Sequence, residues 1–299
     1  MKRKKHFITI TGIFIVLIAV LVIAFFVYKR KTDYWVMTSY ADMSSNQGMF
    51  YTIYNRFDHT LILVDGGWSD NTTQVRDAIN NLGGTVDAWF VTHYHNDHVD
   101  AFSNIYEDPQ GIVIKQIYDS PIDYDKYLEV AQEWDFPESY TRYLDVTKDA
   151  DNITHLREGD VLDIDGLQIV VYSSYGDAVL ENGYGDIPNN ASLVFKISGE
   201  EDSILFCSDC HDASMADYLM NTYTGEELHA EYVQLGHHGN NSFPTYFYDY
   251  VNPEIALFDS PEWLMTGENY TAKDLKQYFL DKNITCYDYV TAPNSFIFR

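Results

Sequence analysis

Three histidines and one aspartate fall within six consecutive residues, directly after an apolar run. The run covers residues 88–92, and the motif that follows reads His93-Tyr94-His95-Asn96-Asp97-His98. Imidazole and carboxylate groups together are typical ligands of zinc, iron and manganese. A solvated polar loop seldom carries three histidines in so short a span, so the motif indicates a metal site. At the end of a strand, the first two histidines would face one ion, and Asp97 and His98 would reach a second ion from the start of the next helix.

The rest of the chain alternates short apolar runs with helical periodicity. The runs predict strands at residues 60–64, 88–92, 112–114, 167–171, 192–196, 203–207, 232–235 and 255–258. The periodicity predicts helices at residues 73–82, 124–134, 213–221 and 272–281, and residues 199–202 are typical of a hairpin turn. This alternation favours a layered α/β fold with helices outside the sheets. Residues 32–299 contain no repeat and no long linker, which predicts one domain.

The histidine motif and two later segments together resemble the metallo-β-lactamase superfamily. The early aspartate of that family matches Asp65, its bridging aspartate matches Asp209, and its late histidine falls in the pair His237-His238. Ser208 stands where the family usually has glycine. The resemblance implies a four-layer αββα sandwich and a metal-dependent hydrolase with two divalent ions.

The resemblance also implies which side chains hold the two ions. One ion would be bound by His93, His95 and Asp209, and the other by Asp97, His98, Asp209 and His237. Two cations that share a carboxylate lower the pKa of a bridging water toward neutrality. The resulting hydroxide would attack phosphorus or a carbonyl carbon. Zinc is the expected metal, with manganese or iron as alternatives.

Further roles follow for residues at the edge of this site. Asp97 would also orient the hydroxide. The family pattern alone favours His237 over His238 as a ligand, which leaves His238 as an outer-sphere or proton-donating residue. Asp65 would hydrogen-bond a ligand histidine and fix its tautomer. His211 is assigned to the surface rather than to the metal.

One departure from the majority pattern bears on the substrate. Many family members supply a third histidine to the first ion, but the corresponding segment here, residues 188–194, contains none. Its Asn-x-Ser-Leu-Val run resembles the branch with the hydrolase domain of competence DNA-uptake channels and the bacterial surface phosphorylcholine esterases. This resemblance implies a phosphodiester or phosphoester substrate, either a small molecule or a cell-surface polymer. The alternatives are a lactone, thioester or amide hydrolase, or a catalytically degenerate metal-binding surface protein.

The first 31 residues differ in character from the rest. Residues 7–28 carry no charge, and basic residues flank both ends. At about 1.5 Å per residue this run spans roughly 33 Å, the thickness of a bilayer core. The sequence therefore predicts a short cytoplasmic stub and a single-pass membrane anchor in residues 1–31. The hydrolase domain, residues 32–299, is expected outside the cytoplasm.

Charge and cysteine content exclude other classes. After residue 31 there are 12 basic and 45 acidic residues, a formal charge of −33. Such a surface repels phosphate backbones, which argues against a nucleic-acid partner. Cys207 and Cys210 lack the second half of a structural zinc site and, with Cys286, make no disulfide framework. They are expected as small buried residues beside the site.

Two segments are expected to border the metal site. Residues 176–190 predict a loop near the ions. Residues 118–143, which are aromatic and acidic, predict a lid over them. The sequence carries no signal for the oligomeric state.

Overall fold

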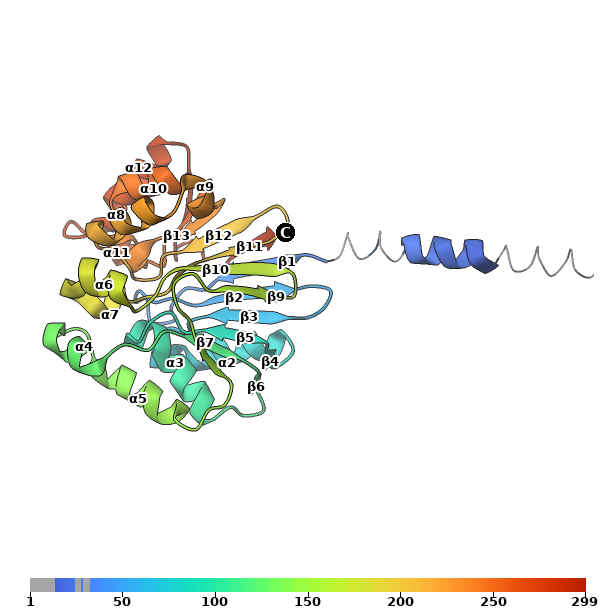
Figure 1. The fold of residues 1–299 in the computed structure, drawn as a ribbon, viewed down its shortest axis with the longest axis horizontal. Helices are drawn as coiled ribbons and strands as arrows, with labels where there is room; N and C mark the ends of the chain where they lie inside the picture. Colours follow the sequence, from blue (N-terminus) through green and yellow to red (C-terminus); the bar gives the residue numbers. More distant parts are fainter. Residues whose placement is uncertain (1–13, 25–27, 29–32) are drawn as a thin grey trace, which may run out of the picture.

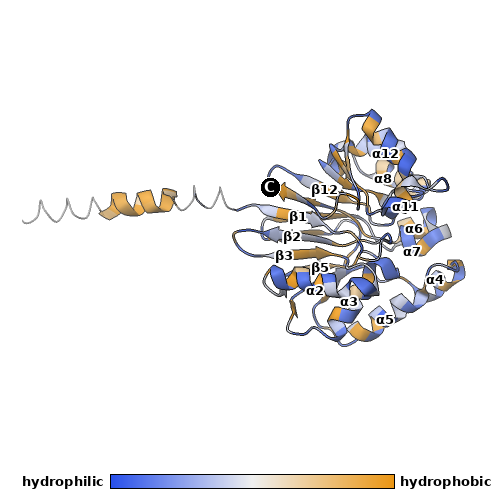
Figure 2. Ribbon diagram, turned by 180° about the vertical axis from the view of Figure 1, so that it is seen from behind, coloured by the Kyte–Doolittle hydropathy of each residue, from blue (hydrophilic) through white to orange (hydrophobic). Residues whose placement is uncertain are grey.

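The computed structural model describes residues 14–24, 28 and 33–299. Residues 14–24 form an exposed helix, coloured as hydrophobic in Figure 2. Among the described residues, no helix has the length and apolar character needed to cross a membrane. Residues 7–13 and 25–27 of the predicted anchor lie outside the described residues, so the anchor stays a prediction.

Two mixed sheets of seven strands form the centre of the body. The first has the strand order β16-β1-β2-β3-β5-β7-β8, and the second β15-β14-β13-β12-β11-β10-β9. A two-stranded ladder, β4-β6, lies beside them. The strands of the first sheet and the ladder are β1 (Trp35–Ser39), β2 (Tyr51–Asn55), β3 (Leu61–Val64), β4 (Thr85–Val86), β5 (Ala88–Phe90), β6 (Val113–Ile114), β7 (Ile117–Asp119), β8 (Ile153–His155) and β16 (Asn294–Phe298). Those of the second sheet are β9 (Val161–Ile164), β10 (Leu167–Ser173), β11 (Val194–Ser198), β12 (Ser203–Phe206), β13 (Tyr232–Gln234), β14 (Ile255–Leu257) and β15 (Thr285–Tyr287).

Helices cover the outer faces of the two sheets (Figure 1). On the first sheet these are α2 (Thr72–Asn81), α3 (Asn96–Glu107) and α5 (Pro137–Thr147), and on the second α8 (Ala213–Thr222), α10 (Thr245–Val251) and α12 (Ala272–Asp281). Shorter helical segments are η1 (Ser69–Asn71), α4 (Tyr124–Val130), α6 (Asp177–Asn182), η2 (Tyr184–Asp186), α7 (Ile187–Asn190), α9 (Gly225–Leu228), η3 (Gly236–Gly239) and α11 (Glu262–Thr266). The layers therefore run helix, sheet, sheet, helix, in agreement with an α/β fold of this family type.

A stack of aromatic rings joins the inner faces of the two sheets. Phe195 of β11 packs at 5.1 Å from Phe90 of β5 and at 5.0 Å from Phe206 of β12, measured between ring centroids. All three side chains are fully buried. Offset stacks of this kind add about 0.5–1.5 kcal/mol per pair to the burial of the rings. The stack lies at the ends of the strands that lead into the histidine motif and Asp209, so it fixes the two sheets where the site is built.

The structure differs from the sequence-based expectations in two segments near the site. The helix predicted at residues 124–134 ends at Val130, because Ala131 is extended and the backbone N–H of Gln132 donates to Asp135 Oδ2 in a turn. The loop predicted at residues 176–190 contains α6, η2 and α7. Its Gly, Asn and Pro residues favour loops, yet they form short capped turns, with Asp186 accepting from the N–H of Asn189.

Candidate metal centre

The histidine motif occupies the connection between a buried strand and a helix. Strand β5 ends at Phe90 and α3 begins at Asn96, so His93 and His95 lie on the loop between them. His95 is extended, at φ −68° and ψ 152°, and precedes the first helical residue. Asp97 and His98 belong to the first turn of α3 and are buried. Because the chain passes from strand to helix within the motif, the pair His93 and His95 and the pair Asp97 and His98 lie at the same end of β5.

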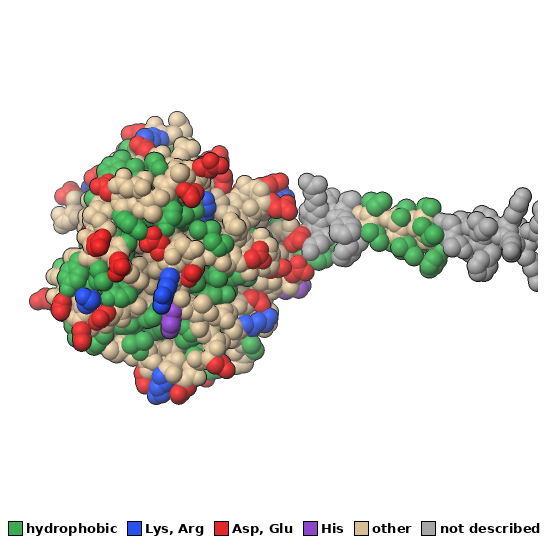
Figure 3. Space-filling view, in the orientation of Figure 1, with side chains coloured by type: hydrophobic (Ala, Val, Ile, Leu, Met, Phe, Trp, Pro, Cys, Tyr) green, Lys and Arg blue, Asp and Glu red, His purple; other side chains and the backbone are tan. Residues whose placement is uncertain are grey.

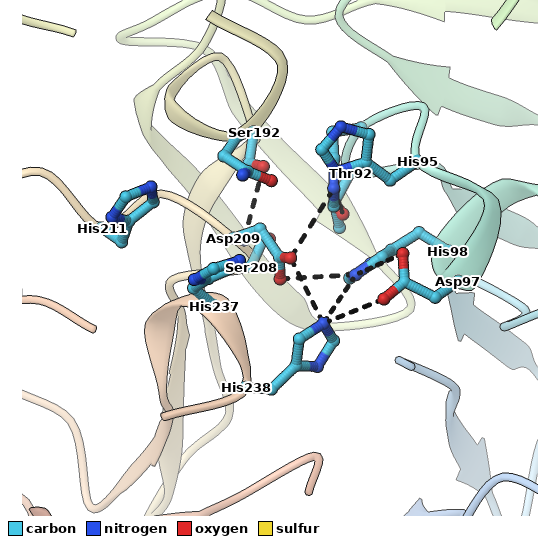
Figure 4. Close-up of polar contacts among 12 residues, drawn as sticks. Thr92, His95, Asp97, His98, Ser192, Ser208, Asp209, His211, His237 and His238 are labelled. Atoms are coloured by element: carbon cyan, nitrogen blue, oxygen red, sulfur yellow. Dashed lines mark hydrogen bonds and ion pairs between the residues drawn. The ribbon is translucent and has the colours of Figure 1, made fainter. Parts of the chain in front are cut away.

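Six side chains form two groups that could hold metal ions. The first group is His93, His95 and Asp209, and the second is Asp97, His98 and His238. Asp209 lies between them, with Oδ2 at 3.8 Å from His93 Nε2 and Oδ1 at 3.3 Å from His98 Nε2. Figure 4 shows Asp209 and the second group converging.

Asp209 is placed by a tight turn after β12. Ser208 has φ +52°, the left-handed conformation that favours glycine. Its hydroxyl donates to the carbonyl of Leu193 at 2.7 Å, and its backbone N–H donates to Gln234 Oε1 at 2.6 Å. Because both neighbouring strands hold the turn, a serine can occupy the position that the family usually gives to glycine.

His238, and not His237, joins the second group. His238 Nε2 lies 3.2 Å from Asp97 Oδ2, 3.3 Å from Asp209 Oδ2 and 3.4 Å from His98 Nε2 (Figure 4). His237 Nδ1 instead donates to the carbonyl of Asn240 at 2.8 Å. Both histidines have positive φ within η3, so the backbone turns between them and sends the two rings in different directions. The geometry thus reverses the sequence-based preference for His237.

Asp65 lies directly behind the second group. It is fully buried after β3, and its Oδ2 accepts a hydrogen bond from His98 Nδ1 at 2.7 Å. Its Oδ1 accepts from the backbone N–H of Thr92 at 2.8 Å. This contact fixes the ring of His98 with Nε2 turned toward Asp209, which is the role expected of a carboxylate behind a ligand histidine.

The unpaired atoms of the site fit divalent ions. Nε2 of His93, Nε2 of His95 and Oδ1 of Asp209 are buried and have no hydrogen-bond partner among the described residues. A buried polar atom left without a partner costs about 1–3 kcal/mol. The separations of 3.3–3.4 Å that join His98 and His238 to Asp209 and to each other are also those of ligands around a common ion. Donors bound at about 2.0–2.2 Å in tetrahedral geometry lie roughly 3.3–3.6 Å apart.

In the metal-free chain, the buried carboxylates and imidazoles of this site shift one another's pKa values. Burial raises the pKa of the Asp209 carboxyl, but His238 and His98 outweigh it and hold that pKa well below its usual range. Burial lowers the pKa of His238, but attraction to Asp209 and Asp97 outweighs it and raises the pKa to about 10. Burial and repulsion from His98 hold the pKa of His93 well below its usual value. A metal ion would replace the proton that these carboxylates otherwise hold on the imidazole of His238.

Asn190 and His211 form a hydrogen-bonded cluster beside the turn that carries Asp209. Asn190, from the segment without a histidine, bonds to the turn after Asp209, because its Nδ2 donates to Asp212 Oδ2 at 2.8 Å. His211 is partly buried, with 15% of its side chain exposed, rather than the solvent-exposed residue expected, and Asp186 Oδ2 lies 3.0 Å from its Nε2. Its ring stacks on His237 at 4.8 Å.

The cysteines take no direct part in the site. Cys207 and Cys210 are buried in the hydrophobic core, and burial raises the pKa of both thiols. Two carboxylates near the site carried no sequence signal, Asp135 before α5 and Asp259 after β14. Neither carboxylate stands at a metal-ligand spacing from another candidate ligand in the sequence, so only the fold brings the two close to the site.

The chain belongs to the metallo-beta-lactamase superfamily, whose family model matches residues 51–210. That range includes the histidine motif, Asp65 and Asp209. No curated protein matches the sequence significantly.

Solved structures share the fold at low sequence identity. The metallo-beta-lactamase fold protein YhfI from Bacillus subtilis has 10% identity and a TM-score of 0.50, covering 89% of this chain and 99% of its own. Igni18, a metallo hydrolase from the archaeon Ignicoccus hospitalis, has 13% identity and a TM-score of 0.50, covering 88% and 99%. CmlA, a diiron beta-hydroxylase from Streptomyces venezuelae, has 13% identity and a TM-score of 0.51, and this chain spans 54% of its length. These similarities show a common fold. The chemistry of this chain has to be inferred from its own site residues.

Proposed function

We propose that this protein is a dinuclear metal-dependent hydrolase that acts on phosphoester substrates. The observation that carries the proposal is the position of Asp209 between two three-residue groups of buried donors. A carboxylate shared in this way can bridge two ions about 3.5–4 Å apart. Bound there, the ions would supply Lewis acidity and a water nucleophile active at neutral pH.

The residues of this chain have distinct tasks in the proposed reaction. His93, His95 and Asp209 would hold the first ion, and Asp97, His98, Asp209 and His238 the second. Asp97 would also accept a hydrogen bond from the attacking water and so orient it toward the substrate. Asp65 would keep His98 in one tautomer. The metal identity is open between zinc, iron and manganese, whose preferred ligands all include this donor set.

The phosphoester class is supported by the segment that lacks a histidine. Asn190 uses its side chain to brace the turn after Asp209 rather than to approach the first group. Residues 188–194 would then supply no donor to the first ion, and this is the feature in which the sequence resembles the branch with the phosphorylcholine esterases. Acidic side chains outnumber basic ones on the face shown in Figure 3, and this argues against a long polyanion and for a small or locally charged phosphoester.

A substrate panel with the full chain tests the proposal. We expect hydrolysis of bis(p-nitrophenyl) phosphate or p-nitrophenyl phosphate, and none after metal removal. Lactone, thioester and β-lactam substrates should turn over much more slowly. Asp97→Ala should abolish activity, whereas Asp70→Ala, at an exposed position in η1, should leave it unchanged. Faster turnover of a lactone or thioester would favour the alternative class. No turnover of any substrate by metal-loaded protein would favour a metal-binding surface protein.

We also propose that the N-terminal segment attaches the domain to the outer face of a cell membrane. Support comes from the uncharged run at residues 7–28 and the basic residues on both sides of it. Cell fractionation with and without residues 1–31 tests this. The full chain should sediment with membranes and be accessible to external protease, and the shortened chain should do neither.

A further inference from the structure

The connection between α4 and α5 turns a carboxylate inward and aromatic rings outward. Asp135 is 2% exposed, whereas its neighbours Trp134 and Phe136 are 70% and 43% exposed. Burial preferences alone would give the opposite arrangement, because aspartate is seldom buried unless it is paired. The inward carboxylate therefore needs a partner inside the protein.

The turn holds this carboxylate in a defined position. Asp135 Oδ2 accepts the backbone N–H of Gln132 at 2.6 Å, and the hydroxyl of Tyr127 donates to the carbonyl of Asp135 at 2.8 Å. Phe136 then takes a left-handed conformation at φ +49°, and α5 begins at Pro137. The other carboxylate oxygen, Oδ1, takes no part in this turn and faces the ring of His95 instead.

Helix α5 is packed directly on the histidine motif. Tyr94, between the two histidines of the first group, lies 4.3 Å from Tyr140 and 5.0 Å from Tyr143, measured between ring centroids. All three rings are buried, and the hydroxyl of Tyr140 donates to the carbonyl of Ile122 at 2.6 Å. This packing ties the start of α5, and the turn before it, to the loop that carries the metal ligands.

The result is that a carboxylate lies next to His95, one of the three members of the first metal group. Asp135 Oδ1 lies 3.6 Å from Nε2 of His95, and that nitrogen is one of the buried atoms without a hydrogen-bond partner. The distance is too long for a good hydrogen bond. It matches the separation of about 3.3–3.6 Å between two donors of one tetrahedral ion.

We propose that Asp135 is an additional ligand of the ion held by His93, His95 and Asp209. It approaches this group from the side of His95 and supplies a protein donor that residues 188–194 do not. The inference rests on the dinuclear centre of the proposed function and assigns one more residue to it. Since Asp135 belongs to the connection between two helices, binding of the first ion also holds the α4–α5 segment against the site.

Metal titration of the full chain tests this without any substrate. Metal-free protein is titrated with Zn²⁺ in competition with a chromophoric chelator. Asp135→Asn keeps the size of the side chain and removes its charge. We expect one of the two zinc equivalents to bind at least tenfold more weakly and the other to be unchanged. Asp125→Asn, at an exposed position in α4 of the same segment, is the matched control and should change neither affinity.

Cobalt substitution gives a second, spectroscopic readout. The visible absorption of Co²⁺ depends on the number and geometry of its ligands, so Asp135→Asn should alter the spectrum and Asp125→Asn should not. Asp135→His supplies a neutral donor at the same position. It should restore tight binding of both zinc equivalents and give a third cobalt spectrum. If Asp135→Asn fails to fold, as judged by circular dichroism of the metal-free protein, the histidine variant decides through its spectrum.

The outcomes separate this inference from the proposed function. Wild-type zinc affinities and an unchanged cobalt spectrum in Asp135→Asn, or an unchanged spectrum in Asp135→His, would overturn the role of Asp135 alone. A wild-type chain that binds no zinc would overturn the dinuclear centre and this inference together. Two bound ions, a selective loss in Asp135→Asn and no hydrolysis of phosphoesters would support the inference and overturn the proposed substrate class.

Discussion

Asp65 shows how one buried side chain can set the geometry of another. Its carboxylate accepts hydrogen bonds from the backbone N–H and the hydroxyl of Thr92 and from Nδ1 of His98. In Asp65→Asn, one acceptor oxygen becomes an amide N–H donor, so His98 loses its fixed tautomer. We expect the affinity for metal to fall by about 10–100-fold. Competition titration with Zn²⁺ measures this, with Asp70→Asn, exposed in η1, as the control. An unchanged affinity in Asp65→Asn would contradict the role given to Asp65.

The buried carboxyl of Asp259 should make the stability of the folded chain depend on pH. This effect can be measured without an activity assay. Burial raises the pKa of its carboxyl to about 7, although the hydroxyl of Tyr51 donates to Oδ1 at 2.7 Å and lowers it in part. Its Oδ2 is buried without a partner among the described residues. Between about pH 4 and pH 7 the folded state holds a proton that the unfolded state has lost. This group therefore lowers stability as the pH rises, by up to about 1.4 kcal/mol per pH unit.

Substituting Asp259 removes that contribution. In Asp259→Asn the free energy of unfolding should fall less steeply from pH 4.5 to pH 7 than it does in the wild type. Urea unfolding of the metal-free proteins at several pH values measures the two slopes. Asp70→Asn should keep the wild-type slope. Parallel curves for Asp259→Asn and the wild type would show that this carboxyl titrates normally in the fold.

Residue types and their spacing predict most of the candidate metal ligands, but they do not predict which way a single imidazole ring points. Four ligand candidates lie within the motif at residues 93–98, so their proximity is local and the sequence predicts it. The choice between His237 and His238 depends on two positive φ angles in η3, which no residue pattern indicates. Asp135 and His95 are about 40 residues apart in the sequence. They meet only because helix α5 packs on Tyr94.

At the scale of elements, two turns from neighbouring strands of the second sheet are packed together. Strands β12 and β13 are parallel, and their carboxyl ends carry Asp209 and His238. Gly236 sits where these turns meet. A Cβ built on it would lie 2.3 Å from the carbonyl oxygen of Cys210, closer than any real contact. Glycine is thus required because the two backbones approach each other.

Gly236→Ala should push these turns apart. We expect both lower stability and weaker binding of both metal ions, because Asp209 serves the two groups. Gly185→Ala is the matched control, since a Cβ there meets no atom within 4 Å. Thermal unfolding and zinc stoichiometry by elemental mass spectrometry measure the two effects. Normal metal content in Gly236→Ala would show that the turns tolerate separation.

Eight of the sixteen strands in the described residues follow a local apolar run and were predicted from it. Each of the eight apolar runs overlaps a strand, and the hairpin at residues 199–202 joins β11 and β12. The sequence did not predict the other eight, which are β1, β2, β4, β7, β8, β9, β15 and β16. Of these, β1 and β16 pair with each other across almost the whole chain, and β16 alternates exposed residues with buried ones. Helix α5 mixes tyrosine with threonine and aspartate, which weakens its apolar periodicity.

At the scale of the whole molecule, the candidate metal centre joins the two halves of the fold. His93, His95, Asp97 and His98 follow β5 of the first sheet, whereas Asp209 and His238 follow β12 and β13 of the second. Both groups of donors draw on both halves. Ions bound here would therefore cross-link the sheets at one edge, beyond the aromatic stack between them.

Metal removal should accordingly lower the stability of the entire domain. A ligand that binds only the folded state adds about 2.7 kcal/mol when its free concentration is a hundredfold above its dissociation constant. In a domain of this size each kcal/mol moves Tm by roughly 2–4 °C or less, so two ions should raise Tm by several degrees. Differential scanning calorimetry at increasing free Zn²⁺ should show Tm rising continuously with concentration. Asp209→Asn, which weakens both groups at once, should show a small rise or none. Equal Tm values for chelated and metal-loaded wild type would mean that the two sheets are not linked through bound ions.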